Sequence, residues 1–206
     1  MIVTRSKPIE EIMDQIDQIM DQKICVIGCS LCAGKLKTGG EPEVKNMIRQ
    51  LQDKRVNVID GVVLKHACSI ESWESLIKEQ PVISDAEVLL VMSCGIGVSL
   101  LGRLCDKIVI PALDTVSLGA ALNDEILLEM CSMCGQCTVG FFSGLCPKSG
   151  CPKSQLNGPC GGSNDGECEV RERKCIWTRI YEVMEAKNML SMLNETLSPT
   201  EYNRGL

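Results

Sequence analysis

The chain has 206 residues, of which 45% are hydrophobic and only 3% aromatic, with a net charge of −6 and an isoelectric point near 5.0. This length allows one ordinary domain and a small second one, or two small domains. The acidic balance excludes a typical nucleic-acid-binding protein, because neutralising phosphates needs clustered Lys and Arg. The uncharged and largely apolar run of residues 88–102 is too short to span a membrane, and the charged N-terminus lacks an apolar export segment. We therefore expect a cytoplasmic protein whose partners are neither nucleic acid nor membrane.

Residues 1–22 are predicted to form an N-terminal amphipathic helix. Pro8 lies near the first helical position, and Glu10 and Glu11 fall in the first turn, where the helix dipole favours acids. The apolar side chains at helical spacing are expected to pack in a core or against another subunit. They are Ile9, Ile12, Met13, Ile16, Ile19 and Met20.

Residues 23–130 are predicted to form an α/β domain, because short apolar runs alternate with segments of helical periodicity. Such alternation indicates a small parallel sheet with right-handed crossovers, Rossmann-like or flavodoxin-like. Asp114, beyond the last predicted strand, is interpreted as a turn or cap residue. The predicted strands are residues 23–27, 56–63, 87–92 and 107–110, and the predicted helices are residues 41–54, 69–79 and 98–105.

Four cysteines follow the predicted strands. Cys29 and Cys32 lie just past the first strand, Cys68 follows the second, and Cys94 follows the third. The carboxyl ends of parallel strands share one edge of a sheet, so these thiols are expected to converge. Four converging thiols in a reducing compartment indicate a metal site, and we expect a 4Fe–4S cluster there. The alternative is that Cys68 and Cys94 are ordinary buried cysteines.

The remaining chemistry-bearing residues of this half have simpler interpretations. Cys25, inside the first strand, and Cys105, on a helix, are interpreted as small core residues. His66, the sole histidine, is interpreted as a loop residue, because four thiols already suffice for a site. The Gly-Ile-Gly after Cys94 lacks the rest of a G-x-G-x-x-G fingerprint, so no dinucleotide site is expected.

Residues 131–192 are predicted to form a cysteine-rich domain, stabilised by metal, that ends in a helix. Eight of the fourteen cysteines fall within residues 131–175, a segment with few large apolar side chains. It cannot bury enough surface to offset its chain entropy, so covalent or coordinate bonds must hold it. Disulfides are disfavoured because thiols stay reduced in the expected compartment. Apolar periodicity after Cys175 predicts the helix, and residues 193–206 are expected to be a polar tail.

The first four of these cysteines have the spacing of an iron–sulfur site. Cys131, Cys134 and Cys137 form a C-x2-C-x2-C run, and Cys146 follows with Pro147 behind it. Three thiolates at this spacing wrap around a cubane and a proline-followed cysteine closes it, as in ferredoxin-type 4Fe–4S binding.

The other four cysteines form a second set at wider spacing. They suit either a second iron–sulfur cluster or a tetrahedral zinc site, and spacing alone does not separate these. The partition into two sets of four also stays open, because in two-cluster ferredoxins the fourth cysteine of one run serves the other cluster. This second set is Cys151, Cys160, Cys168 and Cys175.

Two parts of the sequence resemble a known protein family. The run CPKSQLNGPCGGSNDGECEV, followed by Cys175, Trp177 and Tyr181, resembles the cysteine-rich domain at the end of some methylenetetrahydrofolate reductases. The motifs GPCGG and G-x-C-E-V are specific in combination. The upstream half, with GCSLC, TGGEPEV, SCGIGV and PALDT, is similar to the MetV-type small subunit of the two-subunit reductases of acetogenic bacteria. The resemblance covers nearly the whole chain.

This resemblance implies a subunit rather than an independent enzyme. In the family, methylenetetrahydrofolate is reduced to methyltetrahydrofolate on a flavin that the catalytic partner carries. The chain is then expected to hold two or three 4Fe–4S clusters, with zinc as the alternative at one four-cysteine site. It would accept electrons from an external low-potential donor and pass them to that flavin. Relatives often have a further cysteine where this chain has Leu36, so Cys29, Cys32, Cys68 and Cys94 remain as a set of four.

Two other functions are weighed against electron transfer. In the first, the chain is a zinc-binding structural or assembly subunit of the same complex without a redox role, which the wide loops between Cys151 and Cys175 allow. In the second, it is a thiol or radical enzyme in its own right. This is disfavoured because the C-x3-C-x2-C radical spacing is absent and His66 is the one candidate base near a cysteine.

Overall fold

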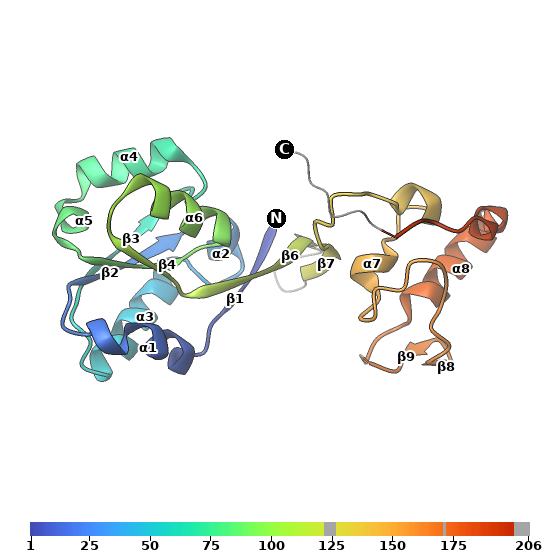
Figure 1. The fold of residues 1–206 in the computed structure, drawn as a ribbon, viewed down its shortest axis with the longest axis horizontal. Coiled ribbons are helices and arrows are strands. Elements are labelled where there is room, and N and C mark those ends of the chain that lie inside the picture. Colours follow the sequence, from blue (N-terminus) through green and yellow to red (C-terminus); the bar gives the residue numbers. More distant parts are fainter. Residues whose placement is uncertain (122–126, 171, 200–206) are drawn as a thin grey trace. The chain divides into compact units, whose positions relative to one another are not determined.

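The computed structural model describes residues 1–121, 127–170 and 172–199. The chain divides into two compact units, Met1–Val116 and Ser117–Leu206. The first unit is an α/β domain, and the second is built of short elements joined by loops (Figure 1). The expected divisions of the chain at residues 22, 130 and 192 stay predictions.

The centre of the first unit is a four-stranded sheet in which every neighbouring pair is parallel. This confirms the predicted α/β class and parallel sheet. The strand order is β3-β2-β4-β5, so the first strand lies between the second and the third, as in flavodoxin-like sheets. The order therefore reverses between β2 and β4, which makes their carboxyl ends the topological switch point. The strands are β2 (Ile24–Cys29), β3 (Val58–Leu64), β4 (Val88–Met92) and β5 (Ile108–Pro111).

Helices cover both faces of this sheet (Figure 1). One face carries α1 and α3, and the opposite face carries α4, α5 and α6. Apolar residues therefore line both sides of β2 and β4, and every residue of these two strands is buried. The helices are α1 (Ile9–Ile16), α2 (Cys32–Lys35), α3 (Glu41–Asp53), α4 (Ile70–Glu79), α5 (Pro81–Asp85) and α6 (Gly95–Leu104).

The N-terminal segment differs from the predicted helix over residues 1–22. A strand, β1 (Ile2–Ser6), comes first, α1 ends at Ile16, and one 3-10 turn, η1 (Asp17–Ile19), follows. The helix cannot begin earlier, because Pro8 caps it with an extended backbone, φ −54° and ψ 143°. Ile12 and Ile16 are fully buried in the core of the first unit, so the apolar stripe is core packing.

The core of the first unit includes Cys25. This residue of β2 is fully buried, which confirms its interpretation as a core residue. Cys105 is half-buried, packs against the same core, and donates from its thiol to the Leu101 carbonyl at 3.4 Å. Each fully buried aliphatic side chain of such a core contributes about 1.5–3 kcal/mol relative to exposure, so the first unit is held by burial.

A second sheet has the strand order β1-β6-β7. Its strands β6 (Leu113–Ala121) and β7 (Leu127–Cys131) are antiparallel, and β6 crosses the boundary between the two units. The sequence pattern predicts no strand at residues 2–6 or after residue 110. Asp114 lies inside β6, so its interpretation as a turn or cap residue is wrong.

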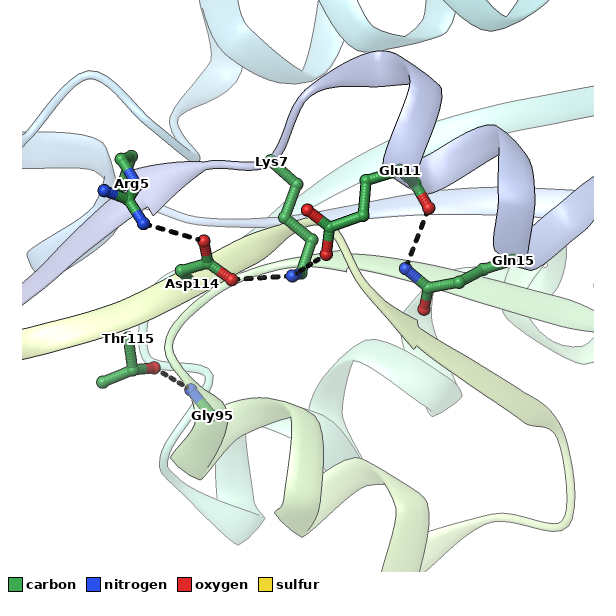
Figure 2. Close-up of polar contacts among 7 residues, drawn as sticks. All are labelled: Arg5, Lys7, Glu11, Gln15, Gly95, Asp114 and Thr115. Atoms are coloured by element: carbon green, nitrogen blue, oxygen red, sulfur yellow. Dashed lines mark hydrogen bonds and ion pairs between the residues drawn. The ribbon is translucent and has the colours of Figure 1, made fainter.

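Asp114 instead joins an ion-pair network within the first unit (Figure 2). Its carboxylate accepts from Lys7 at 2.6 Å and from Arg5 at 3.3 Å, and Lys7 also donates to Glu11. The hydrogen bond from Lys7, followed by that from Arg5, holds the pKa of the Asp114 carboxyl below its ordinary value. The network therefore ties the strand and helix at the N-terminus to β6.

The second unit is held by a much smaller core. Phe142, Trp177, Ile180 and Met184 are buried together, and the rings of Phe142 and Trp177 meet edge to face with centroids 5.4 Å apart. The predicted helix after Cys175 is confirmed as α8 and supplies three of these four residues. The elements are η2 (Val139–Phe142), α7 (Pro147–Gly150), β8 (Ser163–Asn164), β9 (Glu167–Cys168), α8 (Ile176–Ala186) and η3 (Leu190–Asn194).

Two glycines of the first unit give a matched test of its packing. A Cβ at Gly39 would lie 2.1 Å from the Met92 carbonyl oxygen, whereas a Cβ at Gly102, in α6, would meet nothing within 4 Å. Gly39→Ala is expected to lower the free energy of unfolding of this unit by about 1–3 kcal/mol through overpacking. Gly102→Ala is expected to raise it by about 0.5–1 kcal/mol through helix propensity. Urea titration followed by Trp73 fluorescence in a Trp177→Phe background checks both, and equal effects would contradict the packing at Gly39.

The Asp114 network makes a second prediction, about acid stability. Because the folded-state pKa of Asp114 is depressed, its contribution to stability is present above its unfolded pKa, about 3.9. That contribution disappears as the pH falls through the lower folded value. Asp114→Asn is therefore expected to lower the unfolding midpoint at pH 7, and this deficit should shrink below about pH 4. Glu41→Gln, which removes an exposed pair with Lys45, is the control and should cost less. A deficit that is independent of pH would exclude the ion pairs as its cause.

Candidate metal centres

Hydrogen bonds tie together the loops that follow β2, β3 and β4. Ser30 N donates to the Leu64 carbonyl at 2.8 Å, which links the end of β2 to the end of β3. Cys29 N donates to the Gly39 carbonyl at 2.8 Å, and Gly39 lies against the Met92 carbonyl at the end of β4. The turn that follows β2 and the helix α2, which begins at Cys32, are thereby folded back over the switch point.

The loop that contains Cys68 lies against the start of α6. Gly97 is in close contact with Ala67, where an added Cβ would come within 2.7 Å of the Ala67 Cβ. The Trp73 indole fixes this loop by donating to the Ala67 carbonyl at 2.8 Å. Cys94 caps the N-terminus of α6, and Gly95 N donates to Thr115 Oγ1 at 2.7 Å (Figure 2).

The four predicted ligands of the first unit therefore share one sheet edge but differ in exposure. Cys29 is buried, Cys32 and Cys94 are half-buried, and Cys68 is exposed. Over residues 1–121, 127–170 and 172–199, no group of three or more His, Cys, Asp or Glu side chains lies close enough to hold an ion. The assignment of these thiols to one cluster stays a prediction. His66 is half-buried, and its carbonyl accepts from Ser69 N in the loop before α4.

The first set of the second unit surrounds the end of β7. Met133 N donates to Cys131 Sγ at 3.3 Å, and Lys148 Nζ lies 3.9 Å from Cys134 Sγ. Ser149 Oγ donates to the Met130 carbonyl at 2.7 Å, which holds α7 against β7. This contact places Cys146, the residue that caps α7, near the end of β7 that carries Cys131. Cys137 is exposed.

The second set lines a single small cavity. Cys151, Cys160, Cys168 and Cys175 all contribute to its wall, together with Gly150, Lys153, Glu169 and Trp177. The four thiols come from separate segments of the chain, so their convergence is a product of the fold rather than of spacing.

A tight hairpin brings two of these thiols to the cavity. Asp165 and Gly166, with φ of 48° and 83°, form the two-residue turn between β8 and β9. Positive φ at both positions is the requirement of a type I′ turn, which the Asp-Gly pair satisfies. Cys168 N donates to the Arg173 carbonyl at 2.9 Å, and Cys175 N donates to the Gly166 carbonyl at 2.7 Å. The chain after β9 thus returns along the hairpin and places Cys175 beside it.

The other two thiols are held by contacts on either side of the hairpin. Gly150, which precedes Cys151, packs so closely on Ile176 that an added Cβ would lie 2.4 Å from that side chain. The Arg173 guanidinium donates to the Gly150 carbonyl at 2.6 Å. Near Cys160, Glu169 pairs with Lys153, and the Cys160 sulfur lies 3.8 Å from a Glu169 carboxylate oxygen. The hydrogen bond between Lys153 and Glu169 raises the pKa of Lys153 and lowers the pKa of Glu169.

The chemistry of this donor set suits a metal, although in the described part of the chain its side chains do not lie close enough together to hold an ion. Thiolates are soft ligands that select zinc or iron–sulfur clusters, and four of them complete a tetrahedral zinc site or the coordination of a cubane. All fourteen cysteines carry free thiols, so none is committed to a disulfide. By contrast, burial raises the pKa of the Cys25 thiol to about 12, which keeps that residue protonated and unsuited to ligation.

Comparison with known proteins bears on the same region. Residues 110–203 match the family model described as methylene-tetrahydrofolate reductase C terminal. The match confirms the resemblance of this region to the C-terminal domain of methylenetetrahydrofolate reductases, and it includes all eight cysteines of the two C-terminal sets. No curated protein and no solved structure matches the chain.

The structure bears on two further expectations. Among the described residues, no helix is long and apolar enough to cross a membrane. The cysteine spacing predicted the second set but left its partition from the first set open, although the Asp-Gly pair at residues 165–166 is a strong hairpin signal in the sequence.

Differential alkylation tests which thiols are available as ligands. At pH 9 a thiol with a pKa near 12 is about one part in a thousand ionised, so Cys25 should resist iodoacetamide in the folded, metal-free protein. The exposed Cys68, Cys137 and Cys160 should react first. After metal loading, the twelve predicted ligands should become protected while Cys105 keeps its rate. Rapid modification of Cys25, or protection of Cys105 by metal, would contradict these assignments.

Proposed function

We propose that this chain is the iron–sulfur electron-transfer subunit of a methylenetetrahydrofolate reductase. It takes electrons from an external low-potential donor and delivers them to the flavin of the catalytic subunit in one-carbon metabolism. The observation that carries this proposal is the cavity lined by Cys151, Cys160, Cys168 and Cys175, which lies within the residues matched by the reductase family. Clustered thiols suit metal-centred redox chemistry.

Each cysteine set has a role in this proposal. The thiols at the sheet edge, Cys29, Cys32, Cys68 and Cys94, would hold one 4Fe–4S cluster. Cys131, Cys134, Cys137 and Cys146 would hold a second, and the cavity set would hold a third cluster or zinc. When bound, such clusters supply one-electron steps, which a flavin combines into a hydride for the folate carbon.

Two lysines of the second unit are suited to tuning these centres. Lys148 donates to Cys134 Sγ, and Lys153, paired with Glu169, lies in the wall of the cavity beside Cys160. Hydrogen bonds and positive charge at a ligating sulfur stabilise the added electron and raise the reduction potential. The Glu169 carboxylate partly cancels the positive charge of Lys153. Neutralising Glu169 would therefore increase the positive charge that acts on the cysteine sulfurs of the cavity.

A second candidate function has a specific observation in its favour. The cavity set is built on a tight hairpin and the N-terminus of α8, a rigid arrangement typical of structural zinc sites. In that case the second unit would position the catalytic partner without exchanging electrons there. Zinc in the cavity and clusters elsewhere would combine the two functions.

Metal analysis with electron paramagnetic resonance separates these candidates. On anaerobically purified, dithionite-reduced protein, the electron-transfer function predicts about twelve iron per chain for three clusters, or about eight for two. Four iron and one zinc would indicate one redox centre beside a structural site. Zinc without iron would overturn the proposal in favour of the structural subunit. A flavoprotein that co-purifies with the chain supports either function.

Single substitutions then test the ligand sets. Cys94→Ser is expected to remove the iron of the sheet-edge site and leave the C-terminal metal unchanged, because a four-thiolate site seldom retains its metal after losing one ligand. Cys175→Ser is expected to remove the metal of the cavity set alone. Cys105→Ser is the control and should keep the full content. If iron stays unchanged in Cys94→Ser, the sheet-edge assignment is wrong.

A further inference from the structure

The loops at the carboxyl edge of the parallel sheet have a charge opposite to that of the whole chain. Residues 30–40, 65–69 and 93–94 contain three lysines and no acidic residue, whereas the chain carries a net charge of −6. Lys35, Lys37 and Lys65 are all exposed, and within the described residues none of them forms an ion pair. This edge is therefore a positively charged face on an acidic protein.

Nearby carboxylates leave that charge largely uncompensated. Asp114, which follows β5, is already held by Lys7 and Arg5 (Figure 2). Glu71 lines the groove beside Lys65, but it does not pair with that lysine. The acids that begin α3 are engaged locally, Glu41 with Lys45 and Glu43 with Gly40 N.

Large apolar side chains are exposed in these loops or just after them, each within two residues of a predicted ligand. Leu31, 36% exposed, precedes Cys32; Ile70, 51% exposed, lies two residues after Cys68; and Ile96, 54% exposed, lies two residues after Cys94. Because the loops are linked by the Ser30–Leu64, Gly39–Met92 and Ala67–Gly97 contacts described above, these groups belong to one continuous edge. We call this surface, made of Leu31, Lys35, Lys37, Lys65, Ile70 and Ile96, the sheet-edge face.

We infer that the sheet-edge face is the docking site of the electron donor, and that this donor is a small acidic one-electron carrier protein. The inference rests on the proposed function. Exposed lysines around a few apolar side chains fit a transient redox encounter, in which complementary charge accelerates association and a small apolar contact orients the partner. The carboxylates of an acidic carrier are the groups that the three lysines can pair with.

The other protein partner, the catalytic subunit, fits this face less well. The residues that belong to the reductase family begin at residue 110 and thus lie outside the three loops that form the face. A permanent subunit contact is also more apolar and larger than a face with three unpaired lysines. The catalytic subunit is therefore assigned to the family-matched region, and the sheet-edge face is left to the donor.

Charge reversal with a matched control tests the docking site. The variant Lys35→Glu/Lys37→Glu/Lys65→Glu reverses the face, and Lys23→Glu/Lys54→Glu/Lys78→Glu makes the same charge change near the amino ends of the strands. The probe is a reduced plant-type 2Fe–2S ferredoxin, and stopped-flow absorbance follows electron transfer to the chain. The wild-type rate should fall about tenfold between about 20 mM and 500 mM salt. At low salt the face variant should be slower by about tenfold, and the control should stay within about twofold of the wild type.

A second measurement does not depend on bound clusters. Carbodiimide cross-linking of the full chain to the same ferredoxin should join its carboxylates to Lys35, Lys37 and Lys65 and not to the control lysines. In the complex with the catalytic subunit, the three lysines should stay open to acetylation. Cross-links at the control lysines, equal slowing of both variants, or protection by the catalytic subunit would each overturn the inference.

The two measurements also separate this inference from the proposed function. If dithionite reduces no centre in the chain, the proposed function fails, and cross-linking still decides whether an acidic protein docks on the face. If dithionite reduces all variants equally and the face variant accepts electrons from ferredoxin as fast as the wild type, the docking site is wrong while the electron-transfer function stands.

Discussion

The coordination by thiols that we propose is the interaction on which the second unit would depend. Its buried core consists of Phe142, Trp177, Ile180 and Met184, far too little apolar surface to order the loops of residues 131–175 by burial alone. Backbone hydrogen bonds such as Cys175 N to the Gly166 carbonyl shape those loops, but each contributes only about 1 kcal/mol. Four thiols that line one cavity offer bonds of a different strength, because metal binding adds its own free energy to folding.

The first unit is stabilised differently, and this frees its loops. Both faces of the parallel sheet are covered by helices, and β2 and β4 are buried throughout, so the fold does not depend on the thiols at its edge. Loops at the carboxyl ends of such strands can then carry exposed lysines and apolar side chains at little cost in stability. The cysteines of these loops range from buried to exposed, whereas those of the cavity set are half-buried or exposed.

The sequence predicted those parts of the fold that local patterns determine. The four parallel strands, the helices between them and α8 all have apolar periodicity, and Cys25 was identifiable as a core residue because it lies inside a strand. The strands β1, β6 and β7 were missed, since their sheet joins segments about a hundred residues apart. Asp114 was misjudged for the same reason, because its partners Arg5 and Lys7 come from the N-terminus. The four cysteines of the cavity were predicted as one set, but their partition stayed open because the β8–β9 hairpin, rather than cysteine spacing, brings Cys168 and Cys175 together.

The two units thus suit two kinds of protein contact. A subunit that relays electrons must hold its catalytic partner long enough for repeated transfers, yet release each donor after one electron. The first requirement favours an extended, apolar contact, and the second favours a small contact governed by charge, because long-range attraction accelerates association without slowing release. The match to the reductase family model covers residues 110–203, whereas the unpaired lysines lie on the sheet edge of the first unit. A division of this kind would let the donor contact change in evolution, by single lysine substitutions, without disturbing the contact with the reductase.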